Sequence, residues 1–154
     1  MFGMNVKKEN EFIESIRYIV NRLIMLSQAE NCNVIGISSS RDCGREKYNI
    51  CEILSKEIKR KNFNSTLIDT ETGDIQTPQK LEDLLTEERE KNDIIIINIP
   101  PVPIIADSVE YAKKCDIMLL LEKYMYSTYK DYEEAVIRIK SYGIRLEGVV
   151  TYGN

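Results

Sequence analysis

The sequence predicts a doubly wound α/β domain, with a mostly parallel sheet of about five strands and helices on both faces. From residue 34 onward, runs rich in Val, Ile and Leu alternate with segments whose apolar residues recur every three or four positions. The runs are nearly continuous, which is typical of strands buried on both faces, and the helical segments between them indicate parallel crossovers. The predicted strands are residues 34–37, 66–68, 94–99, 117–121 and 148–151.

Amphipathic stretches predict the helices that connect these strands. They cover residues 46–61, 79–91, 107–114 and 131–141. In the first of them Ile50, Leu54 and Ile58 follow one another at intervals of four, so they share one face of a helix. In a sheet of this kind ligands bind beyond the carboxyl ends of the strands. The residues that follow each strand are therefore the place to look for function.

Residues 1–30 are predicted to form a helical segment ahead of an α/β core of residues 31–154, and the two parts make one domain. Its apolar positions, which are spaced by four, three, four and three residues, are Phe12, Ile16, Ile19, Leu23 and Leu26. This spacing predicts a helix with one narrow apolar seam. Packing of the seam on the flank of the sheet is the favoured interpretation, and contact with another subunit is the alternative.

The composition excludes several kinds of site. The chain has 154 residues, 43% of them apolar and 30% charged, and a net charge of −4, which indicates a soluble domain with no general affinity for nucleic acid. There is no histidine, and the four cysteines form no CxxC pair, so neither a zinc site nor a Cys-His or Ser-His-Asp centre is expected. Any metal chemistry would use Mg²⁺ with oxygen ligands, and no metal ligand is assigned.

Neither a signal peptide nor a membrane span is expected. The N-terminus lacks the basic-then-apolar order of a signal peptide, and three prolines break the most apolar region, residues 93–109. A cytoplasmic location follows as an expectation, with membrane association only through a partner.

Four stretches carry a resemblance to a known family. They are ESIRYIVNRL (14–23), DIIIINIPP (93–101), VPIIADSVEYAKKCDIMLLLE (102–122) and the ending YGIRLEGVVTYGN (142–154). In these motifs and their separations the chain resembles the bacterial tyrosine kinases of capsule and exopolysaccharide synthesis, which belong to the deviant P-loop ATPase group that includes ParA and MinD. The resemblance covers nearly the whole chain and implies a P-loop NTPase-like fold.

The first candidate site is the loop ISSSRDCGREKY, residues 37–48, which lies where the family has a phosphate-binding loop of the form ITSxxPGEGKST. With a one-residue insertion, Lys47 falls on the family's lysine and Gly44 on the first glycine of its GEGK core. Glu46 then replaces the second glycine, and Tyr48 replaces the Ser/Thr that binds Mg²⁺. Arg41 and Arg45 would add positive charge to this vestigial loop. A plain strand-to-helix turn, with Asp42 or Ser40 capping the helix, explains the same residues.

The remaining candidates follow the second and third predicted strands. Asp69 and Glu71 match the two carboxylates that the family carries there for Mg²⁺ and the attacking hydroxyl, although a simple strand end and turn is an equal alternative. Asn98 stands where the family has the aspartate that holds Mg²⁺. An amide keeps the shape of that side chain but lacks its charge, so the three residues are vestigial catalytic candidates.

The interpretation that follows is a non-catalytic, kinase-like module with a binding or regulatory role in capsular or exopolysaccharide biosynthesis and export. The alternatives are an active tyrosine autokinase and a partitioning ATPase of the ParA or MinD type. No cofactor is expected, whereas Mg-ATP would be the cofactor under either alternative. The partners implied are the cytosolic part of a membrane chain-length (co-polymerase) protein or a related active kinase.

The N-terminal helix suggests a second kind of contact. Glu14 and Arg17 match the family's E-x-x-R-x-x-R subunit motif, but Val20 replaces its second arginine. Homo-oligomerisation through the seam of this helix is therefore a further expectation. Tyr124, Tyr126, Tyr129 and Tyr132 cluster after the fourth predicted strand and are interpreted as loop and helix-start aromatics rather than phosphorylation targets.

Overall fold

Six parallel strands form a single sheet in the order β1-β6-β5-β2-β4-β3. We describe the protein from a computed structural model that covers residues 1–6, 9–72 and 75–153. The strands are β1 (Phe2–Val6), β2 (Val34–Ser38), β3 (Ser65–Asp69), β4 (Ile94–Asn98), β5 (Ile117–Lys123) and β6 (Leu146–Tyr152). The helices are α1 (Glu9–Glu30), α2 (Glu46–Arg60), α3 (Pro78–Glu88), α4 (Asp107–Ala112) and α5 (Tyr129–Ser141).

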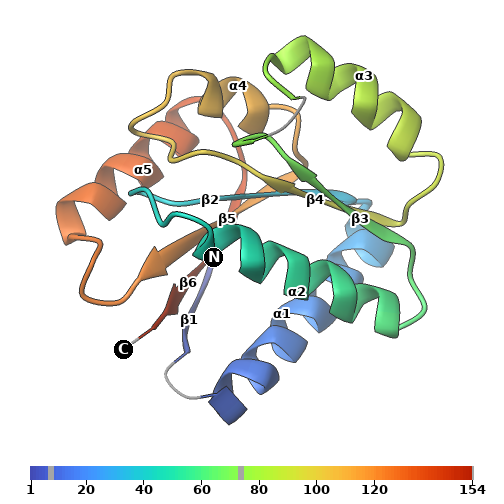
Figure 1. Cartoon of the computed structure of the whole chain (residues 1–154), viewed down its shortest axis with the longest axis horizontal. Helices are drawn as coiled ribbons and strands as arrows, with labels where there is room; N and C mark the ends of the chain where they lie inside the picture. The colour runs from blue at the N-terminus through green and yellow to red at the C-terminus, as the bar shows by residue number, and fades with distance from the viewer. Residues whose placement is uncertain (7–8, 73–74, 154) are drawn as a thin grey trace.

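The doubly wound α/β fold is confirmed, with helices on both faces of the sheet (Figure 1). Helices α1 and α2 cover one face, while α3, α4 and α5 cover the other. Strand residues alternate between the two faces: Ile94 and Ile96 of β4 belong to the first core, and Ile95 and Ile97 to the second. This is why the strands read as continuous apolar runs rather than as alternating ones.

The sheet has six strands rather than the predicted five, and β1 is the strand that the sequence did not reveal. It pairs in parallel with β6, Phe2 lying opposite Gly148. The prediction of an entirely helical segment over residues 1–30 is therefore wrong for its first residues. Gly3 and Asn5 interrupt the apolar pattern of β1, so the sequence alone does not predict this strand. The position of β1 depends instead on pairing with the free edge of β6 and on the space that Gly148 leaves for the Phe2 ring. A side chain at position 148 would occupy that space.

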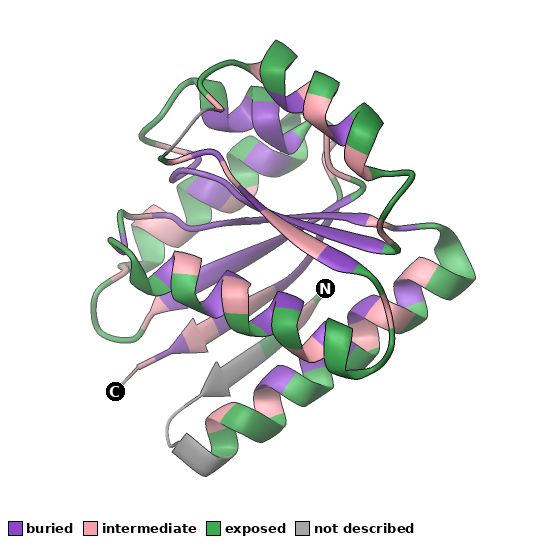
Figure 2. Cartoon of the chain, turned by 45° about the vertical axis from the view of Figure 1, so that its right-hand side comes forward, coloured by how far each residue is buried: buried purple, intermediate pink, exposed green. Residues whose placement is uncertain are grey.

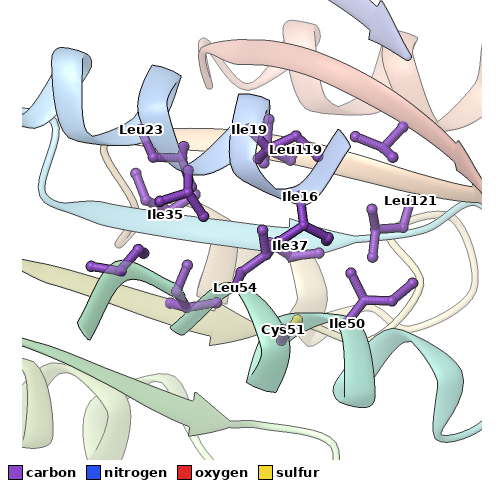
Figure 3. Close-up of a cluster of buried hydrophobic side chains, with 14 of the residues drawn as sticks. Ile16, Ile19, Leu23, Ile35, Ile37, Ile50, Cys51, Leu54, Leu119 and Leu121 are labelled. Atoms are coloured by element: carbon purple, nitrogen blue, oxygen red, sulfur yellow. The ribbon is translucent and has the colours of Figure 1, made fainter. Parts of the chain in front are cut away.

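The apolar seam of α1 packs on the chain's own sheet, as the favoured interpretation required. Ile16, Ile19 and Leu23 are at most 2% exposed and contact the core that β2, β5 and α2 also line (Figure 3). Figure 2 shows the division of this helix into a buried and an exposed face. The expectation that the seam joins subunits is therefore wrong, because these side chains are already covered from within the same chain.

The strand register brings three carboxyl ends together. Asn98, the last residue of β4, lies opposite Ile37 of β2 on one side and Asp69 of β3 on the other. The loop after β2, the turn after β3 and the prolines after β4 therefore meet at one edge of the sheet.

Candidate functional site

Lys47, the second residue of α2, points into the edge of the sheet and is buried. Its side chain is 1% exposed, and its ammonium group lies 2.8 Å from Glu71 Oε1. The same ammonium donates a hydrogen bond to the backbone carbonyl of Ile99. A buried lysine needs such partners, because an unpaired charge in this position would be costly to desolvate. The charge of Lys47 is thus committed to groups of its own chain.

Asn98 links the two candidate carboxylates. Its amide nitrogen donates to Asp69 Oδ1 at 3.0 Å and to Glu71 Oε1 at 2.9 Å. The opposite orientation of the amide would place its oxygen against both carboxylates, so the donors must face them. The amide oxygen is buried and has no hydrogen-bond partner in the described part of the chain. Thr70 holds the backbone of Asn98 in place by donating its N–H and its hydroxyl to the Asn98 carbonyl.

Asp69 is the most heavily hydrogen-bonded carboxylate of the group. It accepts from the Glu71 N–H at 3.0 Å, the Thr72 hydroxyl at 2.6 Å and Arg45 Nη1 at 3.2 Å, besides Asn98. Burial opposes its ionisation, but the hydrogen bonds outweigh burial and hold the pKa of Asp69 below its usual value. Asp69 is therefore a carboxylate at neutral pH. The turn after β3 folds back so that its Glu71 N–H and Thr72 hydroxyl donate to this carboxylate.

Two carboxylates of the chain, one from β5 and one from the loop itself, accept hydrogen bonds from backbone N–H groups of the loop between β2 and α2. The Ser40 N–H donates to Glu122 Oε1 at 2.9 Å, and the Gly44 N–H donates to Asp42 Oδ1 at 2.8 Å. Gly44 has φ +58°, the left-handed region that glycine tolerates. Burial raises the pKa of Glu122, while the hydrogen bonds from the Ser40 N–H and hydroxyl oppose that rise. Two N–H groups that a phosphate-binding loop would aim at its ligand are thus already bonded to side chains.

The two arginines of the loop lie in different places. Arg45 joins the site through Asp69 and stacks on Tyr48, with its guanidinium carbon 3.9 Å from the ring centre. Arg41 turns away to the loop after β5, where it donates to the Tyr126 carbonyl at 2.9 Å and covers that ring at 4.4 Å. The structure therefore brings Lys47 and Arg45 together with the candidate carboxylates, but not Arg41.

The alternative explanation of this loop as a capped helix start is wrong in its detail. The N-cap of α2 is Arg45, and none of the described side chains caps it. Asp42 bonds to the loop instead, as the Gly44 contact shows. Glu46, which the sequence analysis aligned with a glycine, pairs with Lys123 at 2.6 Å. Side chains thus replace the close backbone approach of a glycine-rich loop.

A pocket that sequence reasoning missed lies beside the carboxylates. It has a volume of about 320 Å³. Its lining residues come from the loop after β2, the turn after β3 and the segment from β4 into α4: Asp42, Thr70, Glu71, Pro100, Pro101, Ile104, Ile105, Asp107 and Tyr111. The PP motif and the isoleucines that follow it were the available signal, since this segment leaves the carboxyl end of a central strand.

The tyrosine cluster lies where the sequence placed it, between β5 and the first turns of α5. Thr128 and Asp131 form a reciprocal capping box at the start of α5. Tyr124 and Tyr129 are exposed, and Tyr132 packs against the second core.

Among the residues described, no group of three or more Asp, Glu, Cys or His side chains could hold a metal ion. Within the same residues, none of the helices is long and apolar enough to cross a membrane.

The arrangement defines a P-loop NTPase-like α/β domain. Its central strand β2 lies between β4 and β5 and leads through the loop into the lysine-bearing start of α2. No protein-family model and no curated protein sequence matches the chain.

Solved structures share this fold over almost the whole chain. The kinase domain of the Escherichia coli tyrosine kinase ETK is 14% identical, with a TM-score of 0.74 over 92% of this chain and 75% of that one. The BceF tyrosine kinase domain is 16% identical, with a TM-score of 0.77 over 93% and 78%. The chimerical protein CapA2B2 is 14% identical, with a TM-score of 0.78 over 98% and 93%. The chain therefore has the fold of bacterial tyrosine kinase domains.

Proposed function

We propose that this chain is a non-catalytic module with a tyrosine kinase fold, which binds a partner protein and regulates it. The observation that carries the proposal is the network of Lys47, Glu71, Asn98 and Asp69. In it the ammonium group and both carboxylates already have partners within the chain. A residue set that satisfies itself supports a structural or binding role better than a role in phosphoryl transfer.

The residues present do not fit Mg-ATP. Affinity for a triphosphate requires free N–H groups, a free lysine and a carboxylate that anchors the metal. Here the N–H groups of Ser40 and Gly44 are bonded to carboxylates, and Lys47 is paired with Glu71. Asn98 turns N–H donors, not oxygen ligands, towards the two acidic side chains. A triphosphate would also meet the negative charge of Asp42 in this loop.

The proposed setting is the cytoplasmic side of capsular or exopolysaccharide biosynthesis and export. Two of the similar structures are tyrosine kinase domains, and the family that the motifs resemble works in that process. The partner would be the cytosolic part of a membrane chain-length protein or a related active kinase. The setting rests on the resemblance and on the shared fold.

Nucleotide binding is the direct test. We expect millimolar Mg-ATP to leave the melting temperature unchanged and mass spectrometry to find no phosphotyrosine after incubation. A ligand present at a hundred times its dissociation constant stabilises a fold by about 2.7 kcal/mol, so even an affinity of tens of micromolar would be visible. The ETK kinase domain under the same conditions verifies the assay.

The outcomes separate the candidates. A Mg²⁺-dependent shift that is lost in Lys47→Met would show a working nucleotide site and contradict the proposal. Phosphotyrosine on the chain would then favour the autokinase, and ATP turnover without phosphotyrosine would favour a partitioning-type ATPase.

A further inference from the structure

The pocket beside the carboxylates has one apolar side that is open to a partner. Pro100, Pro101, Ile104 and Ile105 line this side, and the two isoleucines are 59% and 42% exposed. Large aliphatic side chains this exposed next to a pocket provide a surface for the hydrocarbon part of a ligand. They follow the PP motif, at the end of a central strand, so the backbone that carries them is well anchored.

The pocket also has acidic residues in its lining. These are Asp42, Glu71 and Asp107. The charge of Glu71 is balanced by Lys47, whereas Asp42 and Asp107 form no ion pair with any described residue. The pocket therefore keeps two uncompensated carboxylates, and charge complementarity selects a cation.

The lining also includes a buried tyrosine whose hydroxyl has no hydrogen-bond partner among the described residues. This residue, Tyr111, is 4% exposed. The Tyr111 hydroxyl is not among the solvent-inaccessible side-chain atoms that lack a hydrogen-bond partner. In the described part of the chain these atoms are Asn98 Oδ1, Ser127 Oγ and Tyr152 OH. The Tyr111 hydroxyl therefore keeps some contact with solvent. Burial, followed by the charge of Asp107, raises the pKa of Tyr111, so the hydroxyl is neutral and can accept a hydrogen bond at neutral pH.

We propose that this pocket binds an arginine side chain of the partner protein, with its methylenes on Ile104 and Ile105 and its guanidinium between Asp42 and Asp107. This inference rests on the proposed binding function, because the arginine could occupy the pocket only if the neighbouring loop does not bind a nucleoside triphosphate. A planar guanidinium has five donors in a fork, which suits two carboxylates and a tyrosine oxygen better than the compact ammonium of lysine. The exposed isoleucines favour an arginine within a chain over a free cation, because residues flanking the arginine can cover them.

The probe is a pentapeptide with blocked termini that carries arginine between two leucines, titrated into the ¹⁵N-labelled full chain. We expect amide shift changes at the residues that line the pocket and a dissociation constant of about 1 mM or tighter. The same peptide with citrulline keeps the shape and loses the charge, and it should bind about fivefold more weakly or worse. Asp107→Asn should weaken the arginine peptide about three- to fivefold.

Glu110→Gln is the matched control, since this exposed residue lies on the same helix and pairs with Lys113 away from the pocket lining. It should bind the peptide as the unmodified chain does, and both variants should keep the native amide spectrum. Equal binding of the citrulline peptide, shifts at another surface, or full affinity in Asp107→Asn would each overturn the docking proposal. Titration with Mg-ATP distinguishes the two failures. If Mg-ATP shifts the loop amides, the proposed function is wrong, whereas if neither ligand binds, only the arginine site is wrong.

Discussion

Replacement of Asn98 by aspartate tests whether the amide is what allows two carboxylates to lie together at this edge of the sheet. In Asn98→Asp, both donated hydrogen bonds, at 3.0 and 2.9 Å, become contacts between carboxylate oxygens. A hydrogen bond to a charged group contributes about 1.5–3 kcal/mol, so losing two would cost about 3–6 kcal/mol before any repulsion is counted. The folded protein can escape the repulsion by binding a proton at the new carboxyl.

The cost of that proton sets the dependence on pH. Keeping an aspartate of ordinary pKa about 3.9 protonated at pH 7 costs about 4 kcal/mol, and at pH 5 about 1.5 kcal/mol. The new carboxyl has a higher pKa in the folded chain than in the unfolded chain. The loss of unfolding free energy that it causes is therefore complete at pH values above the folded-state pKa, and it disappears at pH values below the unfolded-state pKa. We therefore expect Asn98→Asp to lose about 3–5 kcal/mol of unfolding free energy at pH 7, and to recover about 2 kcal/mol of this at pH 5.

Urea denaturation of the unmodified chain and the variant at both pH values measures this difference. Asn49→Asp makes the same chemical change at an exposed position of α2 and should stay within about 0.5 kcal/mol of the unmodified chain. If Asn98→Asp is as stable as the unmodified chain at pH 7, with no divalent cation added, the amide does not hold the two carboxylates together. The reasoning about the closed site would then be refuted.

Three further predictions concern the fold. Gly36→Ala should lower the unfolding free energy by about 1–3 kcal/mol. The added methyl group would lie 2.7 Å from a cysteine sulfur and 2.9 Å from an isoleucine methyl in the core. Gly3→Ala, whose methyl group would enter open space, should leave the unfolding free energy unchanged in the same denaturation assay. Ile16→Glu should unfold the chain rather than dissociate an oligomer, since this residue is 2% exposed. Ile13→Glu, at a residue that is 44% exposed, should remain folded when measured by circular dichroism. An Ile16→Glu variant that is folded but dissociated would restore the interpretation of the seam as a subunit contact. Burial raises the pKa of Cys51 to about 12, so iodoacetamide at pH 8 should label Cys51 only after denaturation, and rapid labelling of the native chain would show that α2 opens.

The sequence predicted the parts of the fold that depend on burial. The five core strands and their helices have strong apolar patterns because both faces of the sheet are covered. The strand β1 has no such pattern, since it owes its place to pairing with β6 and to the packing of the Phe2 ring against Gly148, which has no side chain. The spacing of the α1 seam identified the residues that pack, but spacing alone does not tell a chain's own sheet from a partner.

The sequence named residues that the structure brings together, but it did not predict how they are bonded. The strand register puts Asp69 beside Asn98 whatever the side chains do. The direction of the Arg41 side chain and the pairing of loop N–H groups with Glu122 and Asp42 depend on side-chain conformations. The periodicity of apolar residues along the sequence carries no information about these side-chain directions and hydrogen bonds.

The residues at this site support one another. Lys47 is buried, so it needs an anion, and Glu71 supplies one from the turn after β3. Glu71 and Asp69 then lie close together, and the amide of Asn98 stabilises both where a carboxylate would repel them. A single substitution at Asn98 would break this balance and leave the loop as it is, because the Ser40 and Gly44 N–H groups would still be bonded to Glu122 and Asp42. The Asn98→Asp substitution alone should therefore lower stability without producing ATP turnover.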